Sequence, residues 1–201
     1  MTRQLALPIS PQPAPTLDNF VPGANAELLA RLRALHAGQL TESVLYLWGE
    51  PGSGRSHLLH ASARPGLAIA DDVERLDEPR QIALFNAINA ARDSGGAVLA
   101  AGNAPPAQLA LRDDLKSRLA WGLVYQVKPL SDAQKALTLH AEAARRGLKL
   151  SDEVVWYLLT HVRRDLHSLT GLLDQLDRTS LEQRRAVTLP LVRELIRNLE
   201  Q

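Results

Sequence analysis

Four short apolar runs alternate with stretches of helical periodicity in the first two thirds of the chain. The runs cover residues 43–49, 67–70, 97–102 and 123–127. An almost unbroken apolar run of this length is typical of a strand that is buried on both faces of a sheet. Strands that alternate with helical stretches indicate a parallel sheet with crossover helices. The pattern therefore predicts an α/β fold for this part of the chain.

The helical stretches between these runs have an apolar periodicity of their own. From Asn25, which can cap a helix, to Gly38, leucines recur with the spacing of one helical face. Residues 79–93 have a similar stripe, formed by Ile82, Phe85 and Ile88. We expect a helix at each of these two places.

After the fourth apolar run the pattern is helical only. Ser131 and Gln134 have the spacing of a capping box for a helix that ends at Gly147. Ser151 is expected to begin a second helix, and Thr188 to cap a fourth. The apolar faces of the last three helices are expected to contain Val154, Leu158 and Val162, then Leu166, Leu169, Leu173 and Leu176, then Val192, Leu195 and Leu199. A small helical bundle should follow the sheet.

Changes in composition divide the chain into three parts. Residues 1–15 contain four prolines and read as an extended, flexible tail. Residues 16–130 form the predicted α/β base, and residues 131–201 the helical part. Within the tail, residues 4–9 nevertheless read Q-L-A-L-P-I, with apolar side chains that serve no obvious core. An N-terminal strand packed on the sheet and plain disorder are the two structural alternatives for this stretch.

Composition and charge narrow the classes of protein. No apolar run approaches the length of a membrane span, and the N-terminus is too short and too broken for a signal peptide. The absence of cysteine excludes disulfides and thiolate metal sites, which fits a reducing cytoplasm. The six histidines include no pair at metal-ligand spacing, and the net charge of +1 is evenly spread. We therefore expect neither a metal cage nor direct specific DNA binding.

The strongest chemical motif is G-E-P-G-S-G-R-S at residues 49–56, directly after an apolar run and before a helical stretch. This context predicts a phosphate-binding loop (P-loop). The residues expected to surround the phosphates are Gly49, Gly52, Ser53, Gly54, Arg55 and Ser56. Glycines permit backbone angles that aim successive N–H groups at phosphate oxygens, and the helix N-terminus adds partial positive charge. The alternative is a glycine-rich turn without a ligand.

One position departs from the general P-loop pattern, because Arg55 stands where lysine is usual. Arginine keeps the positive charge and can grip phosphate with two N–H groups, but it is bulkier and differently aimed. The substitution is compatible with nucleotide binding, but it argues against efficient chemistry on the γ-phosphate.

Polar residues that follow other strands can complete the site. Asp71 ends the second apolar run and is expected to help Ser56 hold Mg²⁺. Asp72 stands where a hydrolytic ATPase commonly has a glutamate base, and it is one methylene shorter. The alternative for this acidic pair is a helix cap and a first-turn charge. Asn103 after the third run and Arg118 before the fourth are, taken singly, a turn residue and a solvated charge.

Together these motifs resemble the AAA+ nucleotide-binding modules, and among them the relatives of the bacterial initiator DnaA. Residues 16–25, with Phe20 and Val21, resemble the segment that packs near the adenine. Residues 52–59, which include His57, resemble the first Walker motif, and residues 68–72 the second. Asn103 falls at the first sensor position, and R-L-A-W-G at 118–122 resembles the segment that carries the arginine finger, Arg118. H-V-R-R-D-L at 161–166 resembles the second sensor, with Arg164 the first choice and Arg163 the second.

Within the DnaA relatives the sequence is most similar to the regulatory inactivators of DnaA, the Hda family. The resemblance rests on Arg55, on P-L-S-D at 129–132 and on L-D-Q-L-D-R-T-S at 173–180. Too few residues separate Ser56 from Asp71 for the extra strand and helix usual in the family, so we expect a four-stranded sheet that lacks one edge strand. The sequence ends after the helical lid, which predicts that the DNA-binding domain of DnaA is lacking.

The resemblance implies a regulator of replication initiation rather than a motor. The family begins with a clamp-binding motif, which is matched here by Gln4, Leu5, Leu7, Pro8 and Ile9. The implied partners are DnaA and the DNA polymerase III sliding clamp, the implied cofactors are ADP, or ATP as second choice, with Mg²⁺, and the implied location is the cytoplasm. Arg118 would reach the γ-phosphate of DnaA-bound ATP. The alternatives are a self-sufficient ATPase of the helicase-loader or clamp-loader type, and an adaptor with a vestigial P-loop. The sequence is also compatible with assembly of this chain into a homo-oligomer.

Overall fold

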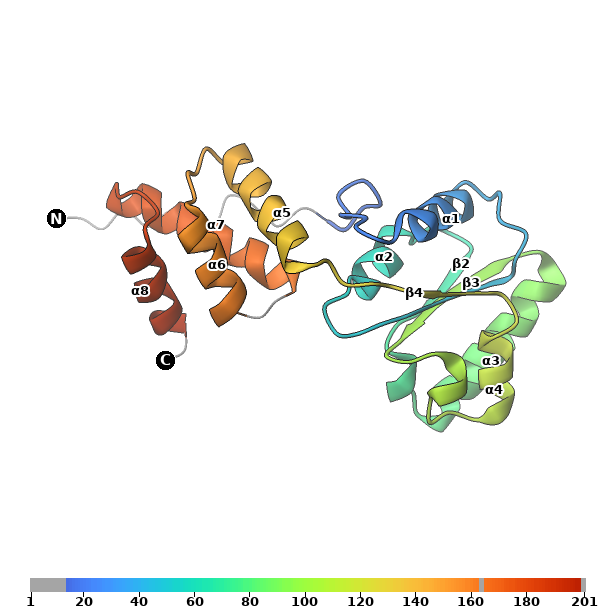
Figure 1. Ribbon diagram of the computed structural model, residues 1–201. Helices are drawn as coiled ribbons and strands as arrows, with labels where there is room; N and C mark the ends of the chain where they lie inside the picture. Colours follow the sequence, from blue (N-terminus) through green and yellow to red (C-terminus); the bar gives the residue numbers. More distant parts are fainter. Residues whose placement is uncertain (1–13, 163–164, 200–201) are drawn as a thin grey trace. The chain divides into compact units, whose positions relative to one another are not determined.

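A computed structural model describes residues 14–162 and 165–199 of the chain. These residues divide into two compact units, one formed by Ala14–Pro129 and the other by the residues that follow Pro129 (Figure 1). In the described residues, no helix has the length and apolar character needed to cross a membrane.

The first unit is built on a parallel sheet of four strands, as predicted. The strands are β1 (Val44–Trp48), β2 (Leu67–Ala70), β3 (Ala97–Gly102) and β4 (Leu123–Gln126), and their order across the sheet is β2-β3-β1-β4. Leu45 of β1 lies opposite Leu99 of β3 and Leu123 of β4. Because β2 pairs only with β3 and β4 pairs only with β1, these two strands form the edges of the sheet, and the described residues contain no further strand beyond either of them.

Helices cover both faces of this sheet (Figure 1). The first unit contains α1 (Ala26–His36), α2 (Arg55–Ala61), α3 (Glu78–Ser94) and α4 (Asp113–Leu119), with short 3₁₀ helices η1 (Val73–Arg75) and η2 (Pro106–Gln108). Leu45 and Leu47 of β1 pack with the leucines of α1 and α2, whereas Val44 and Tyr46 pack with α3 and α4. This alternation follows from the two-residue period of a strand, and it puts the P-loop helix α2 and helix α4 on opposite faces.

The structure corrects two details of the helices predicted in the first unit. Asn25 precedes α1, but its side chain makes no capping bond; it is buried and bonded to the backbone of Pro22 and Lys128. The expected stripe of α3 is also wrong in part, because Ile82 is exposed while the buried positions are Leu84, Ile88 and Ala91. Contacts with distant parts of the chain therefore determine which side chains of each helix are buried.

The two edge strands are less buried than their apolar sequences indicate. Ile69 of β2 and Val124 of β4 are exposed, whereas β1 and β3 are buried almost throughout. A strand with one neighbour and incomplete helix cover keeps part of its surface in water, and an apolar run in the sequence does not reveal this.

The second unit is a bundle of helices α5 (Asp132–Arg145), α6 (Asp152–His161), α7 (Leu166–Gln183) and α8 (Leu189–Leu199). The capping box of Ser131 and Gln134 is confirmed, and Ser151 caps α6 as expected. The core of the bundle includes Val154, Leu158, Leu169, Leu173, Leu176 and Val192. Val162 packs against this core but lies one residue beyond the end of α6.

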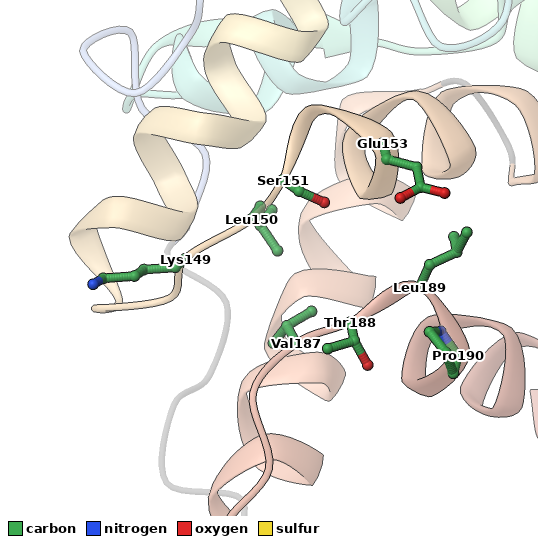
Figure 2. Close-up of a pocket in the computed structure, with 8 residues that line it drawn as sticks. All are labelled: Lys149, Leu150, Ser151, Glu153, Val187, Thr188, Leu189 and Pro190. Atoms are coloured by element: carbon green, nitrogen blue, oxygen red, sulfur yellow. The ribbon is translucent and has the colours of Figure 1, made fainter.

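The bundle has a surface depression of about 530 Å³, and Figure 2 shows the residues that line it. It lies between the loop before α6 and the loop before α8 and is lined by Lys149, Leu150, Ser151, Glu153, Val187, Thr188, Leu189 and Pro190. Its lining includes none of the site residues predicted from the sequence.

Candidate functional site

The P-loop joins the carboxyl end of β1 to α2. Gly54, directly before α2, has φ +98°, a left-handed backbone that favours glycine, and a Cβ there would lie 2.8 Å from the Phe20 ring. A Cβ on Gly49 would lie 2.6 Å from the carbonyl oxygen of Val127. Side chains at these two positions would push the loop out of its path. The glycines therefore set the shape of the loop.

Arg55 and Ser53, which belong to the P-loop and the start of α2, have buried polar side-chain atoms. Arg55 is only 9% exposed and Ser53 only 7%. Within the described residues, Arg55 Nη1 and Ser53 Oγ are buried and have no hydrogen-bond partner. A buried polar group without a partner costs about 1–3 kcal/mol, and more when it is charged. Phosphate oxygens would satisfy both groups, so the donor set fits the phosphate chain of a nucleotide.

The segment before α1 forms a wall beside the loop. The ring of Phe20 contacts Gly54 and lies 5.6 Å from the ring of His57, centroid to centroid. The Nε2 atom of His57 is 3.0 Å from the carbonyl oxygen of Thr16. Val21 follows Phe20 and is half-buried. The structure thus brings Phe20 and His57 to the P-loop, although nearly forty residues separate them in the sequence.

Acidic and amide side chains follow β2 and β3 at the same edge of the sheet as the P-loop, because the strands are parallel. Asp71 is half-buried and its Oδ1 accepts a hydrogen bond from the backbone N–H of Asp72. The side chain of Asp72 pairs with Arg75 at 3.4 Å. Asp72 also has φ +46°, an uncommon backbone for an aspartate that costs of the order of 1 kcal/mol. The ion pair with Arg75 does not support the role of a catalytic base for Asp72. The side chain of Asp72 makes no capping hydrogen bond to η1, so its contacts do not support the role of a helix cap either.

Asn103 lies beside a group of residues that the sequence did not single out. Its backbone N–H donates to Glu74 Oε2 at 3.2 Å, and its side chain is exposed. The Tyr46 hydroxyl donates to the carbonyl oxygen of Ala104 at 2.8 Å. Burial raises the pKa of Tyr46, the charge of Glu74 raises it further and the charge of Arg55 lowers it, so the phenol stays protonated. Only the three-dimensional structure places Tyr46 and Glu74 here, because no motif contains them.

The residues predicted to hold Mg²⁺ do not form a metal cage by themselves. Ser56 is exposed at the start of α2, and Asp71 follows β2. In residues 14–162 and 165–199, no three His, Asp or Glu side chains gather in a way that could hold a metal. P-loop proteins complete the metal shell with phosphate oxygens and water, so the donor set fits Mg²⁺ only together with a nucleotide.

Arg118 lies on α4, among residues of α3. Its Nε donates to Asn89 Oδ1 at 2.9 Å, and its Cζ lies 3.6 Å from the centre of the Trp121 ring and 5.0 Å from that of Phe85. Among the described residues it has no acidic partner within ion-pair distance. Asn89 and Trp121 were not predicted as site residues. The signal was weak, since Trp121 stands within the quoted R-L-A-W-G motif and Asn89 in no motif.

Several predicted residues lie outside the described part of the chain. They are Gln4, Leu5, Leu7, Pro8 and Ile9 of the tail, and Arg163 and Arg164 of the second sensor.

Comparison with known proteins connects both units to one group. The family described as "Hda, lid domain" matches residues 132–196. An uncharacterized protein of Haemophilus influenzae is 34% identical, and the match covers 98% of this chain and 99% of that protein. That alignment spans 230 positions whereas this chain has 201 residues, so the relative carries residues that are missing here.

Two solved structures show the same fold. Domain III of the Thermotoga maritima replication initiation protein DnaA has a TM-score of 0.74 and 21% identity, and the match covers 94% of this chain and 98% of that one. DnaA from Aquifex aeolicus, bound to AMPPCP, has a TM-score of 0.68 and 21% identity, with 82% of this chain and 65% of that chain covered.

A P-loop after the central strand β1, acidic residues after β2 and a helical lid unit define an AAA+ nucleotide-binding module. The sheet lacks one edge strand, and the match of the lid is specific to one branch of that class. The chain belongs to the Hda-like, DnaA-related AAA+ proteins.

Proposed function

We propose that this chain is a nucleotide-bound regulator of chromosome replication initiation, which acts in the cytoplasm on ATP-bound DnaA. Three parts share the work: a clamp-binding tail (1–15), a nucleotide-binding base (16–130) and a lid (131–201). Arg118 of the base reaches the γ-phosphate in DnaA, and the initiator becomes inactive when its ATP is hydrolysed. An arginine supplied in trans stabilises charge in the transition state and is worth about 10³–10⁵-fold in GTPase systems.

The observation that carries the proposal is the environment of Arg118. It lies on α4, on the sheet face opposite α2, and it has no ion-pair partner among the described residues. Its Nε is bonded to Asn89, and its two Nη groups make no hydrogen bond with any described residue, which leaves them for a bidentate contact. Because Arg118 is oriented by Asn89 and lies on the sheet face opposite the P-loop helix, it is suited to contact a nucleotide that is bound by another molecule.

The chain's own nucleotide would be mainly structural. Arg55 supplies the positive charge at the phosphates, Ser53 adds a donor, and Phe20 with His57 forms the wall beside the loop. Ser56 and Asp71 would hold Mg²⁺, Asn103 would stand beside the terminal phosphate, and Arg164, or Arg163, would contact it from the lid. Bound Mg²⁺ would neutralise phosphate charge. Because Asp72 pairs with Arg75, little intrinsic hydrolysis is expected, and ADP is the expected resident.

The tail would bring the module to the replication machinery. Gln4 supplies a polar anchor, and Leu5, Leu7 and Ile9 supply apolar contacts for a groove on the sliding clamp. Pro8 limits the conformations of the free segment and so lowers the entropy cost of binding. Changing Gln4→Ala together with Leu7→Ala should abolish clamp binding in a pull-down while ADP binding survives. Loss of both would indicate a folding defect instead.

Stimulated hydrolysis tests the central claim. ATP-loaded DnaA is mixed with clamp on DNA and with this chain, and the ATP remaining on DnaA is measured over time. Arg118→Ala should reduce the stimulated rate at least 1000-fold, the lower bound for trans arginines. Arg80→Ala is the matched control, because it removes another arginine of the same unit that is largely exposed. Full stimulation by Arg118→Ala would refute the proposal.

Nucleotide binding separates the alternatives. Calorimetry with ADP should show binding that weakens about 10- to 100-fold in Arg55→Met, which loses a charge-assisted contact; exposed Arg33→Met is the control. No ADP binding by the unaltered chain would favour an adaptor with a vestigial P-loop. Turnover of about 1 s⁻¹ or more without DnaA, in the ordinary enzyme range, would favour a self-sufficient ATPase.

A further inference from the structure

Trp121 is a large side chain for which the fold has no evident structural use. It is 40% exposed, and none of the hydrophobic clusters formed by the described residues includes it. The residue follows the end of α4, where its backbone N–H donates to the Arg118 carbonyl oxygen at 3.2 Å. That bond needs no particular side chain. The indole is therefore best explained by what lies on its surface.

Two guanidinium groups lie on this indole. Arg118 Cζ is 3.6 Å from the ring centre, within van der Waals contact, and Arg92 Cζ is 4.6 Å from it. Tryptophan attracts a cation over its ring face more strongly than the other aromatic residues do. The second aromatic ring near Arg118, that of Phe85, is farther away at 5.0 Å. Of these two aromatic rings, that of Trp121 therefore makes the closer contact with the Arg118 guanidinium.

The contact with the Trp121 ring restricts a rotation of the Arg118 guanidinium that the hydrogen bond to Asn89 still allows. Nε of Arg118 donates to Asn89 Oδ1 at 2.9 Å, which fixes one atom of the guanidinium. The plane of the group can still turn about that bond. A flat indole in contact with the guanidinium restricts this rotation and so fixes the directions in which the two Nη groups point.

We propose that Trp121 is a positioning residue that holds the Arg118 guanidinium in the orientation needed to meet a phosphate on a partner. The inference rests on the proposed function of Arg118. It assigns to Trp121 an effect on the rate at which a formed complex hydrolyses ATP, and no effect on how tightly the complex forms. Misplacement of a group that must approach a transition state lowers the rate of the chemical step rather than binding.

Kinetics with three variants test this assignment. Trp121→Leu keeps an apolar side chain and removes the ring face, Trp121→Phe keeps a smaller face, and Trp156→Leu is the control, an exposed tryptophan of the lid unit. Trp121→Leu should lower the maximal stimulated rate about 3- to 30-fold, the range of cation–π contacts. The concentration that gives half-maximal stimulation should stay unchanged, and Trp121→Phe should recover most of the rate.

The spectrum of Arg118 provides a readout that does not depend on DnaA. In the free protein the Arg118 Nε–H proton is assigned by its loss in Arg118→Ala. It should move downfield in Trp121→Leu, because the ring-current shift disappears while the bond to Asn89 remains. Signals elsewhere should stay in place, which shows that the variant is folded. If Trp121→Leu does not fold, Trp121→Phe must give intermediate changes in both shift and rate.

The outcomes separate the two proposals. If Arg118→Ala loses stimulation and Trp121→Leu keeps the full rate, the inference on Trp121 is overturned and the proposed function stands. A changed half-maximal concentration with an unchanged maximal rate also overturns it, because Trp121 would then be a binding contact. If Arg118→Ala itself stimulates fully, the proposed function fails first, and the role of Trp121 in that reaction fails with it.

Discussion

The side chain of Asn25 ties the start of the first unit to the end of its last strand, and its removal should be costly. Asn25 is 4% exposed. Its Nδ2 donates to the carbonyl oxygens of Pro22 at 3.0 Å and Lys128 at 2.8 Å, and its Oδ1 accepts from the Lys128 N–H at 2.8 Å. Asn25→Ala removes all three bonds and leaves the backbone groups of Lys128 without this partner.

The cost can be estimated from these bonds. Each contributes about 1 kcal/mol net, and a buried group left without a partner costs about 1–3 kcal/mol. The two bonds to Lys128 and the local bond to Pro22 together predict a loss of about 2–4 kcal/mol. Asn19→Ala is the matched control, because Asn19 also bonds to backbone groups but does so at an exposed site. It should cost no more than about 1 kcal/mol.

Urea unfolding measures the effect. In a Trp156→Phe background only Trp48 and Trp121 report, and both belong to the first unit. Asn25→Asp distinguishes the observed role from helix capping. Asparagine and aspartate cap helices about equally well, so a capping role predicts almost no change. If Asn25 instead joins the two segments by its hydrogen bonds, Asn25→Asp should lose at least as much stability as Asn25→Ala. The reason is that the aspartate side chain cannot donate a hydrogen bond and buries a charge. A loss below about 0.5 kcal/mol for both variants would refute the reasoning, since single buried bonds already exceed it.

Three further predictions concern other parts of the fold. Arg146 bonds Glu142 and Asp174 at 2.8 Å with its side chain 15% exposed, so Arg146→Ala should destabilise the second unit by about 2–3 kcal/mol in chemical unfolding, with exposed Arg178→Ala as control. The pKa of Glu142 is affected most by burial, which raises it, but the bonds and charges of Arg145 and Arg146 outweigh burial and lower it. The stabilisation from this group is therefore present at neutral pH and should be lost as the pH falls through the lowered pKa; thermal unfolding of the chain from pH 7 downward should show this, and Arg146→Ala should reduce the dependence. Gly122→Ala should cost about 3 kcal/mol or more, because a Cβ would overlap the carbonyl oxygen of Val44 in β1; Gly96→Ala, which meets only Ser94 and Ala91, should be mild, and equal melting temperatures for the two would contradict the argument.

Several features of this protein were determined by local sequence alone. The four strands lie within one or two residues of the apolar runs, and the P-loop lies between β1 and α2. The capping box of Ser131 and Gln134 is present as predicted. Such features depend on residues close together in the chain, namely backbone freedom at glycine, side-chain bonds over three positions and the period of apolar residues. The four-strand sheet was predictable because too few residues separate Ser56 from Asp71.

The tertiary structure decided what depends on residues far apart in the chain. The local sequence predicted that Asn25 caps α1. Its side chain instead bonds to the backbone of Lys128, which is 103 positions away in the chain. The α3 stripe turned from Ile82 to Leu84 because the sheet and α4 determine which helix face is covered. Among the residues that the structure describes, Arg55 became a buried cation whose Nη1 has no hydrogen-bond partner, and Arg118 came to lie on Trp121 beside Asn89. A sequence motif names the residues that carry charge, but packing between distant segments determines which of those charges are buried, paired or free to act.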